Sequence, residues 1–503
     1  MSSRPRGALA LVLHSHMPYV EGFGTWPFGE EWLWEAVACV YLPLLELLDG
    51  APVTIGLTPV LCDQLEAMRG EPGDRYLRFL REIRAAIHAE DAAGLERGGD
   101  PDLAAEVRRA AGDYELADQA FEHRDRDLLR GFAELDRVEL WTSAATHALL
   151  PMLATDAGLR LQLATGTASH LRRFAEWGGG FWLPECAYEP GLERDLADHG
   201  VRAFCVDQTA VPGFDHLRPV ATEAGPVAVP IDWPTVELVW NESEGYPVHG
   251  TYRDYHRRTV HDLKPWSNAG TPYDRAAALA LAREHARDFV ERAVGRVAEG
   301  GLLCCGLDTE LLGHWWYEGP VWLASVLEEA PRQGLELVTV SEGLERAEPQ
   351  YTDLVPSTWG SGKDLSTWDS PGVGQMAFAA RRAELQTVAA TAGHARPRAA
   401  LERAARELLA VQASDWAFMA TRELAGDYPG ERLQAHSANL DAALEALSGP
   451  AEPRADVQAE AGGRAMPSER GAGGPAEVFS RGVPDPALRN LAPDLDLASL
   501  TSP

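Results

Sequence analysis

Short apolar runs recur along the first 350 residues, and most of them end in a polar cluster. The runs read ALALVL, VTIGL, VELW, GFWL, AFCV, VELVW, LLCCGL and LELVTV. Continuous apolar strands are buried on both faces, which is typical of a parallel sheet. Helical patterns at residues 32–49 and 277–297 lie between them. This alternation predicts an α/β fold, and seven or eight such units indicate a TIM-like barrel with its chemistry at the carboxyl ends of the strands.

The pattern also predicts how the chain is divided. Residues 1–350 carry the strands of the barrel, and residues from about 65 to 136 form a helical insertion between two of them. Helical periodicity replaces the strand pattern at 379–387, 398–414 and 437–447, so we expect a helical domain over 351–447. Residues 448–503 are rich in Pro, Gly, Ala and acids and poor in aromatic side chains, which predicts a disordered tail.

Composition narrows the class of partner. The 503 residues carry a formal charge of -31, and such an acidic surface repels nucleic acid and anionic lipid. None of the six cysteines forms a C-x-x-C pair, and their low density favours a reducing, cytoplasmic location. No apolar run reaches the roughly 18 residues that cross a bilayer, and the run at 8–13 is too short for a signal peptide.

Two carboxylates stand where strands are predicted to end. Glu185 follows GFWLP, and Asp308 follows LLCCGL. A carboxylate among apolar residues is costly to bury unless it is paired, and an arginine partner is the simplest structural explanation. Two such acids with tryptophans nearby, Trp315 and Trp316 above all, instead suggest the acid and nucleophile of a glycosidase, because indole faces stack on sugar rings.

His14 and His16 lie two residues apart on the first predicted strand, so their side chains point to the same side. They could line a pocket, form a pair that is hydrogen-bonded within the barrel rim, or bind a metal, since imidazole is a common ligand. The residues alone leave these three interpretations open.

Longer motifs carry a resemblance. LHSHMPY, SAATHALLPM, GFWLPECAY and LDTELLGHWWYEGP are similar, in this order, to the signatures of glycoside hydrolase family 57, and most similar to those of its 1,4-alpha-glucan branching enzymes. MPYVEGFGTWPFGEE, GYPVHGTYRDYHR, STWGSGKD and QASDWAFM extend the similarity over about residues 7–447.

The resemblance implies a distorted (β/α)7 barrel, one unit short of eight, followed by a helical domain. It implies a retaining mechanism in which Glu185 is the nucleophile and Asp308 the general acid/base, with an α-1,4-glucan such as amylose or glycogen as substrate and α-1,6 branches as product. It also implies that no metal or cofactor is needed. The predicted substrate-binding residues are His14, His16, His147, Trp26, Trp266, His314, Trp315, Trp316, Trp359, Trp368, Asp415 and Trp416. We expect a monomer or a weak homo-oligomer.

Three alternative functions remain open. The first is hydrolysis or chain transfer by another member of the same family. Relatives carry Tyr-Gly-Tyr-Pro where this chain reads Glu-Gly-Tyr-Pro, so that Glu244 replaces a tyrosine thought to shield the intermediate from water. This replacement favours hydrolysis by an α-amylase, or a 4-α-glucanotransferase, of the same family. A metal-dependent hydrolase using His14, His16 and Asp308 needs further ligands, of which His147 is the only obvious one. A non-catalytic glucan-binding protein is the third alternative, and the retained Glu185 and Asp308 argue against it.

Overall fold

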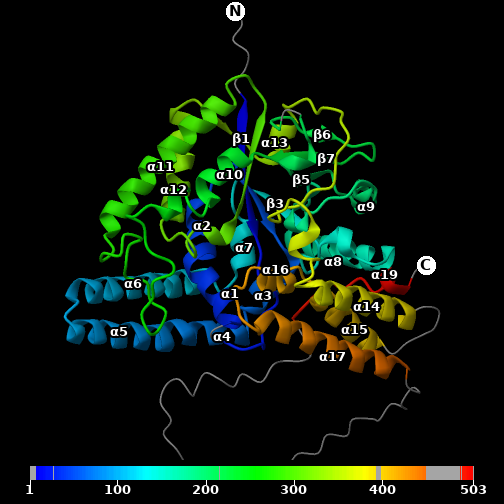
Figure 1. The fold of residues 1–503 in the computed structure, drawn as a ribbon, viewed down its shortest axis with the longest axis horizontal. Coiled ribbons are helices and arrows are strands. Elements are labelled where there is room, and N and C mark those ends of the chain that lie inside the picture. The colour runs from blue at the N-terminus through cyan, green and yellow to red at the C-terminus, as the bar shows by residue number, and fades with distance from the viewer. Residues whose placement is uncertain are drawn as a thin grey trace, which may run out of the picture.

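A closed parallel barrel forms the centre of the molecule (Figure 1). The computed structural model describes residues 7–25, 28–213, 216–391, 398–448, 488 and 490–501. Its strands are β1 (Ala8–Ser15), β2 (Thr54–Leu57), β3 (Glu139–Ser143), β4 (Gly180–Trp182), β5 (Ala203–Asp207), β6 (Val220–Ala221), β7 (Val227–Ile231), β8 (Leu302–Asp308) and β9 (Glu336–Leu337). The order is β2-β3-β4-β5-β7-β8-β1-β9, and β1 also pairs with β2. Seven parallel strands therefore close on themselves, which confirms the predicted (β/α)7 barrel.

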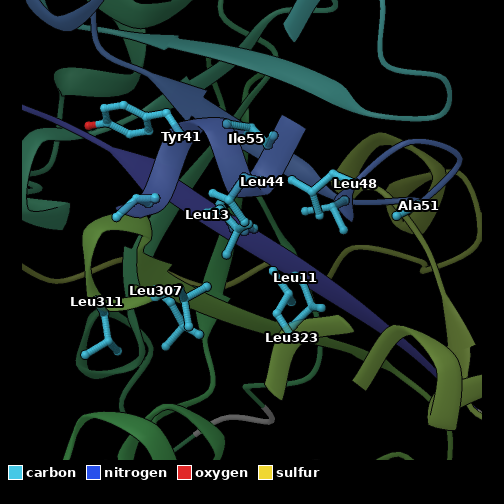
Figure 2. Close-up of a cluster of buried hydrophobic side chains, with 14 of the residues drawn as sticks. Leu11, Leu13, Tyr41, Leu44, Leu48, Ala51, Ile55, Leu307, Leu311 and Leu323 are labelled. Carbon is cyan, nitrogen blue, oxygen red and sulfur yellow. The ribbon is translucent and has the colours of Figure 1, made fainter. Parts of the chain in front are cut away.

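The barrel is stabilised by the apolar runs that the sequence shows. Leu11 and Leu13 of β1, Ile55 of β2 and Leu307 of β8 are all at most 2% exposed. Figure 2 shows them together with Leu44 and Leu48, which lie on the helical segment after β1, and with Leu323 on a later helix. Each fully buried aliphatic side chain contributes roughly 1.5–3 kcal/mol relative to exposure. Burial on both sides explains why these strands carry no polar alternation.

Two strand predictions are wrong. VELVW lies in helix α10 (Trp233–Trp240), which begins with Pro234 in its first turn, where a missing N–H costs nothing. A short apolar run cannot be assigned to strand or helix by periodicity alone. The seventh barrel strand is instead β7, whose sequence VAVPI contains Pro230 and pairs with β8 through Ile231 only. The run LELVTV forms only the two-residue β9 before a helix begins.

Helices cover the barrel and form a helical hairpin beside it (Figure 1). Helices α5 (Ala85–Gly98) and α6 (Pro101–His123) lie antiparallel within the segment between β2 and β3, where the helical insertion is predicted. The other helices up to residue 344 are α1 (Glu30–Ala36), α2 (Leu42–Leu47), α3 (Pro59–Ala67), α4 (Glu71–Arg78), α7 (Leu128–Ala133), α8 (Asp156–Phe174), α9 (Leu192–Asp198), α11 (Arg275–Arg296), α12 (Gly319–Arg332) and α13 (Val340–Leu344). Across the described ranges, no helix is both long and apolar enough to cross a bilayer.

The helices after residue 373 pack on the barrel through a second core. They are α14 (Gly374–Thr391), α15 (Arg398–Val411), α16 (Asp415–Thr421) and α17 (Tyr428–Ser448). Leu408 and Leu440 share this core with Tyr19 and Leu161 from the barrel side. The exact domain boundaries remain a prediction, but this core and the contact of Asp415 with His16 place α16 beside the loop that follows the barrel's first strand.

The end of the chain differs from the expected disordered tail. Leu488 and residues 490–501, which include α19 (Ala498–Thr501), pack into the second core. Leu488, Leu491 and Leu500 are buried, and the carbonyl of Leu500 accepts a hydrogen bond from Thr391 at 2.9 Å. The composition averaged over 448–503 predicts disorder because it does not show that leucines are concentrated near the end of this segment. The rest of the predicted tail lies outside the described residues.

Candidate active site

A cavity of about 1590 Å³ opens at the carboxyl ends of the barrel strands. Its lining includes His14 from β1, His147 after β3, Glu185 after β4 and Asp308 at the end of β8. Parallel pairing aligns these ends, and the register places His14 of β1 opposite Asp308 of β8. The two predicted carboxylates therefore face one cavity, although more than a hundred residues separate them in the chain.

Glu185 sits on a strained turn. Its φ is 56° and that of Cys186 is 49°, which is a left-handed conformation that non-glycine residues rarely adopt. Such residues cost about 1–3 kcal/mol each and persist only where the surroundings hold them. The carbonyl of Glu185 accepts from the backbone N–H of Trp359 at 2.7 Å, and Tyr188 bridges to Ser357. A later loop therefore holds the turn that presents this carboxylate.

Three imidazoles stack beside Glu185. The ring centroids of His16 and His147 lie 4.1 Å apart, and Nε2 of His14 and Nε2 of His147 lie 2.9 Å apart. Burial holds the pKa of His14 and that of His147 well below the usual value, and His16 adds to both effects. These two imidazoles are therefore neutral, so each ring carries one N–H donor and one acceptor nitrogen, a set that suits hydroxyl groups.

The helical region closes one side of this cluster. Nδ1 of His147 lies 2.9 Å from the Ser414 hydroxyl, and Nε2 of His16 lies 3.0 Å from the Asp415 carboxylate. Nδ1 of His147 is also 3.9 Å from Oε1 of Glu185. Residues just before and at the start of α16 thus orient His147 and His16, which lie in the loops that follow β3 and β1.

The two strand-end carboxyls both bind protons more tightly than usual. Burial raises the pKa of Glu185 well above its ordinary value, and the negative charges of Asp308 and Asp415 raise it further. Burial raises the pKa of Asp308 to about 6, with His16 opposing the shift. Carboxyls that repel one another's charge in a buried site favour the form in which one keeps a proton. The pair can therefore supply one acid and one carboxylate near neutral pH.

The structure brings most of the predicted site residues together. The nine that line the cavity are His14, His16, His147, Glu185, Asp308, His314, Trp315, Trp359 and Asp415. Trp359 packs edge-on against Trp182, whose ring stacks on His14 with centroids 4.5 Å apart. Trp315 is 40% exposed and faces Trp240 at the cavity mouth, with ring centroids 5.7 Å apart.

Four of the predicted tryptophans do not line the cavity. Trp316 and Trp368 are 1% exposed, and Trp416 is 2% exposed; all three belong to hydrophobic cores. Their large rings fill space between helices and loops, as most tryptophans do. Trp266 instead lies under the guanidinium of Arg257, 4.6 Å from its ring centroid. Trp26 lies outside the described residues.

Two residues that contact the predicted site residues were not among the predictions: Glu310, which lines the cavity, and Ser414, which lies behind His147. Glu310 accepts a hydrogen bond from the Tyr41 hydroxyl at 2.5 Å and from the backbone N–H of His16 at 3.2 Å, and burial raises its pKa to about 7. Ser414 orients His147. Proximity in sequence could have found both, because Glu310 lies two residues after Asp308 and Ser414 directly precedes Asp415.

The three interpretations of the histidine pair can now be compared. His14 and His16 both line the cavity and both bond to other site residues. In the described part of the chain, no group of three or more His, Cys, Asp or Glu side chains is arranged to hold a metal ion.

Glu244, which replaces the expected tyrosine, is exposed and is not among the cavity-lining residues. Glu242, two positions earlier, does line the cavity, and it pairs with Arg422 at 2.8 Å.

Comparison with known proteins agrees with this geometry. The model of glycosyl hydrolase family 57 matches residues 10–356, and that of the C-terminal region of 1,4-alpha-glucan branching enzymes matches residues 377–461. A probable 1,4-alpha-glucan branching enzyme of Mycobacterium tuberculosis is 33% identical over 481 residues, which cover 86% of this chain and 90% of the relative. Among solved structures, the GH57-type branching enzyme of Pyrococcus horikoshii superimposes with a TM-score of 0.80 at 32% identity, covering 86% of this chain and 88% of that one. An α-amylase of Thermotoga maritima gives 0.75 at 25% identity, covering 88% and 94%.

Proposed function

Because the chain belongs to glycosyl hydrolase family 57, we propose that it cuts α-1,4 linkages of a glucan and transfers the released segment to form α-1,6 branches. The observation that carries this proposal is the placement of Glu185 in the turn after β4 and of Asp308 at the end of β8, where both face one cavity and their negative charges repel. A pair of carboxyls flanking the scissile bond is the apparatus of a retaining glycosidase. The similarity to branching enzymes favours transfer to a 6-hydroxyl over hydrolysis.

In the first step, a carboxylate oxygen of Glu185 attacks the anomeric carbon of the donor sugar. Asp308 gives its proton to the departing oxygen as the C1–O4 bond breaks, so one chain leaves with a new hydroxyl and the other is held as a glycosyl ester. The positive charge that develops at the anomeric carbon favours the ionised form of Glu185. The shared proton is then best placed on Asp308, as the acid role requires.

In the second step, the Asp308 carboxylate takes the proton of an incoming 6-hydroxyl. The oxygen attacks the anomeric carbon, the ester bond to Glu185 breaks, and an α-1,6 linkage forms. The neutral His14 and His147 form a wall of the cavity beside the bound sugar, while Trp359 offers an indole surface beside Glu185. If water enters in place of the 6-hydroxyl, the result is hydrolysis.

The test is to incubate the protein with linear amylose and to follow the anomeric proton signal of α-1,6 linkages by NMR. We expect that signal to grow, and Glu185→Gln to abolish it, because the amide is a far weaker nucleophile. Shortened or lengthened α-1,4 chains without new branches would instead identify an α-amylase or a 4-α-glucanotransferase. A Glu185→Gln protein that branches as fast as the wild type would contradict the assigned role.

We further propose that the enzyme works in the reducing cytoplasm on amylose- or glycogen-like chains. All six thiols are free, and four of the five buried ones, Cys186, Cys205, Cys304 and Cys305, belong to the barrel strands or the turn after β4. Disulfides are rare in reducing compartments, where thiols persist. A monomer or weak homo-oligomer remains our prediction, which light scattering at several protein concentrations tests directly.

A further inference from the structure

Lysine is nearly absent from this chain, and its two positions are unusual. Of the 45 basic residues, 43 are arginines, and only Lys264 and Lys363 are lysines. Each ammonium lies over an aromatic ring: Lys264 is 4.3 Å from the ring centroid of Tyr255, and Lys363 is 3.5 Å from that of Trp233. An ammonium is a compact point charge, whereas a guanidinium is a broad plane, so the two are not interchangeable in a confined site. A composition this rich in arginine makes lysine informative where it does occur.

Lys363 neutralises a carboxylate that is wholly buried. Nζ of Lys363 lies 2.7 Å from Oδ2 of Asp207, the last residue of β5, whose side chain is 0% exposed. The indole N–H of Trp233 donates to the same oxygen, while Thr209 donates to Oδ1 through its backbone N–H at 2.9 Å and its hydroxyl at 2.7 Å. Lys363 supplies the positive charge at this point, and without it a buried carboxylate would keep only neutral partners.

The same lysine closes the loop that holds Glu185. Its backbone N–H donates to Gly360 at 2.9 Å, its carbonyl accepts from Thr358 at 3.2 Å, and its φ is 59°. Trp359 lies inside this tight loop. Its N–H bonds the carbonyl of Glu185, and its ring packs edge-on against both Trp182 and Trp233.

We propose that Lys363 is a positioning residue for Glu185. By binding Asp207 and covering the face of Trp233, it fixes the loop at 358–363 to the barrel, and the loop then holds the strained turn at Glu185 through Trp359. Lys363 itself is not among the residues that line the cavity, so the proposed effect on Glu185 is transmitted through the loop. This inference rests on the proposed function, because it assumes that Glu185 is the nucleophile.

The experiment compares two basic residues that each pair with a buried strand-end aspartate. Arg296 pairs with Asp232, which follows β7, is 0% exposed and is not part of the cavity lining. Lys363→Met and Arg296→Met therefore remove the same kind of ion pair, one beside Glu185 and one away from it. Displacing a reacting group by about 1 Å can cost about 10²-fold in rate. We expect Lys363→Met to lower kcat for branching about 10- to 100-fold with KM changed by less than about threefold, whereas Arg296→Met lowers Tm and leaves kcat near that of the wild type.

Two further variants complete the design. Lys363→Arg should recover less than half of the lost kcat, because the guanidinium does not fit between Asp207 and Trp233 as the ammonium does. If Lys363→Met fails to fold, Asp207→Asn, which has nearly the same shape, should give the same selective loss of kcat.

The proposal is overturned if folded Lys363→Met keeps the wild-type kcat, if Lys363→Arg restores it fully, or if Arg296→Met loses as much. Glu185→Gln separates this outcome from failure of the proposed function. An inactive Glu185→Gln with a fully active Lys363→Met removes only the role of Lys363, whereas an active Glu185→Gln removes the proposed mechanism itself.

Discussion

The barrel mouth and the helical region after residue 373 use the same residue types in opposite ways. At the mouth, Glu185 and Asp308 are partly buried and line one cavity, where the charge of Asp308 raises the pKa of Glu185, and the indole N–H of Trp359 finds no partner within the described residues. In the helical region, Glu384 accepts four hydrogen bonds, and the indole N–H of Trp416 donates to the carbonyl of Ala410 at 2.8 Å. A buried acid surrounded by donors stabilises the fold, whereas one that is held against another acid in a cavity is available for chemistry.

The largest effect should come from the acid at the mouth. Asp308→Asn removes the proton donor, and general acid–base catalysis contributes about 10²–10⁴-fold, so we expect branching of amylose to fall by about 10³-fold. A maltosyl fluoride donor tests the reason, because fluoride leaves without protonation. Formation of the glycosyl ester from this donor, measured by fluoride release, should fall far less than the reaction with amylose. Equal losses with both donors would contradict the acid role.

A matched change in the helical region should affect stability instead. Glu384 on α14 accepts from the backbone of Ala154 and Thr155, from the Thr155 hydroxyl and from Gln412. Glu384→Ala leaves these donors without a partner, and each buried unsatisfied group costs about 1–3 kcal/mol. We expect a loss of about 3 kcal/mol or more in urea unfolding, with kcat per folded molecule unchanged. Loss of kcat without loss of stability would contradict this prediction and would show that Glu384 contributes to catalysis.

A pair of identical substitutions sharpens the comparison between the two tryptophan populations. Trp416→Phe removes the hydrogen bond to Ala410 and should cost about 1–2 kcal/mol in stability without changing KM. Trp359→Phe keeps an aromatic ring but a smaller one at the cavity, and aromatic contacts are worth about 0.5–1.5 kcal/mol. We therefore expect it to raise KM for amylose a few-fold with little change in stability. The reverse pattern would show that Trp416, and not Trp359, contacts the glucan.

The smallest effect concerns the dependence of stability on pH. Burial raises the pKa of Asp308 to about 6, so the folded state binds this proton more tightly than the unfolded state does. The stability associated with the protonated form is therefore fully present below about pH 4 and is lost as the pH rises through 6. Asp308→Asn should raise Tm at pH 8 and not at pH 4. Catalysis needs the same proton, so kcat/KM should decline above about pH 6.

The sequence predicts the barrel better than it predicts the tryptophans. Runs such as LLCCGL follow from burial on both faces, and the two carboxylates follow from the ends of such runs. The strand β7 was missed because Pro230 interrupts its pattern. Trp316, Trp368 and Trp416 were misplaced because a local motif does not show whether an indole ring points into a core or toward a cavity. That direction is decided by contacts with residues far away in the chain.

The sequence position of Ser414 beside Asp415 marks it as a candidate, but its bond to His147 could not be predicted, for the same reason. Its partner His147 is distant in the sequence, and the packing of α16 on the barrel brings the two side chains together. The positive φ of Glu185 is likewise invisible in the sequence, because it depends on the bond from Trp359. The sequence shows which residue types follow each strand. It does not show site geometry that depends on contacts between distant parts of the chain.

Closure of the barrel by β1 has a consequence for the way the molecule is made. Ala8 lies opposite Leu302, so β1, which is synthesised long before β8, acquires its neighbour on that side only when β8 has been made. Throughout that interval an apolar edge with free N–H and C=O groups remains open to other nascent chains. Chains interrupted before residue 308 should consequently be retained by chaperones or deposited in inclusion bodies, and slow translation of the second half should increase that fraction.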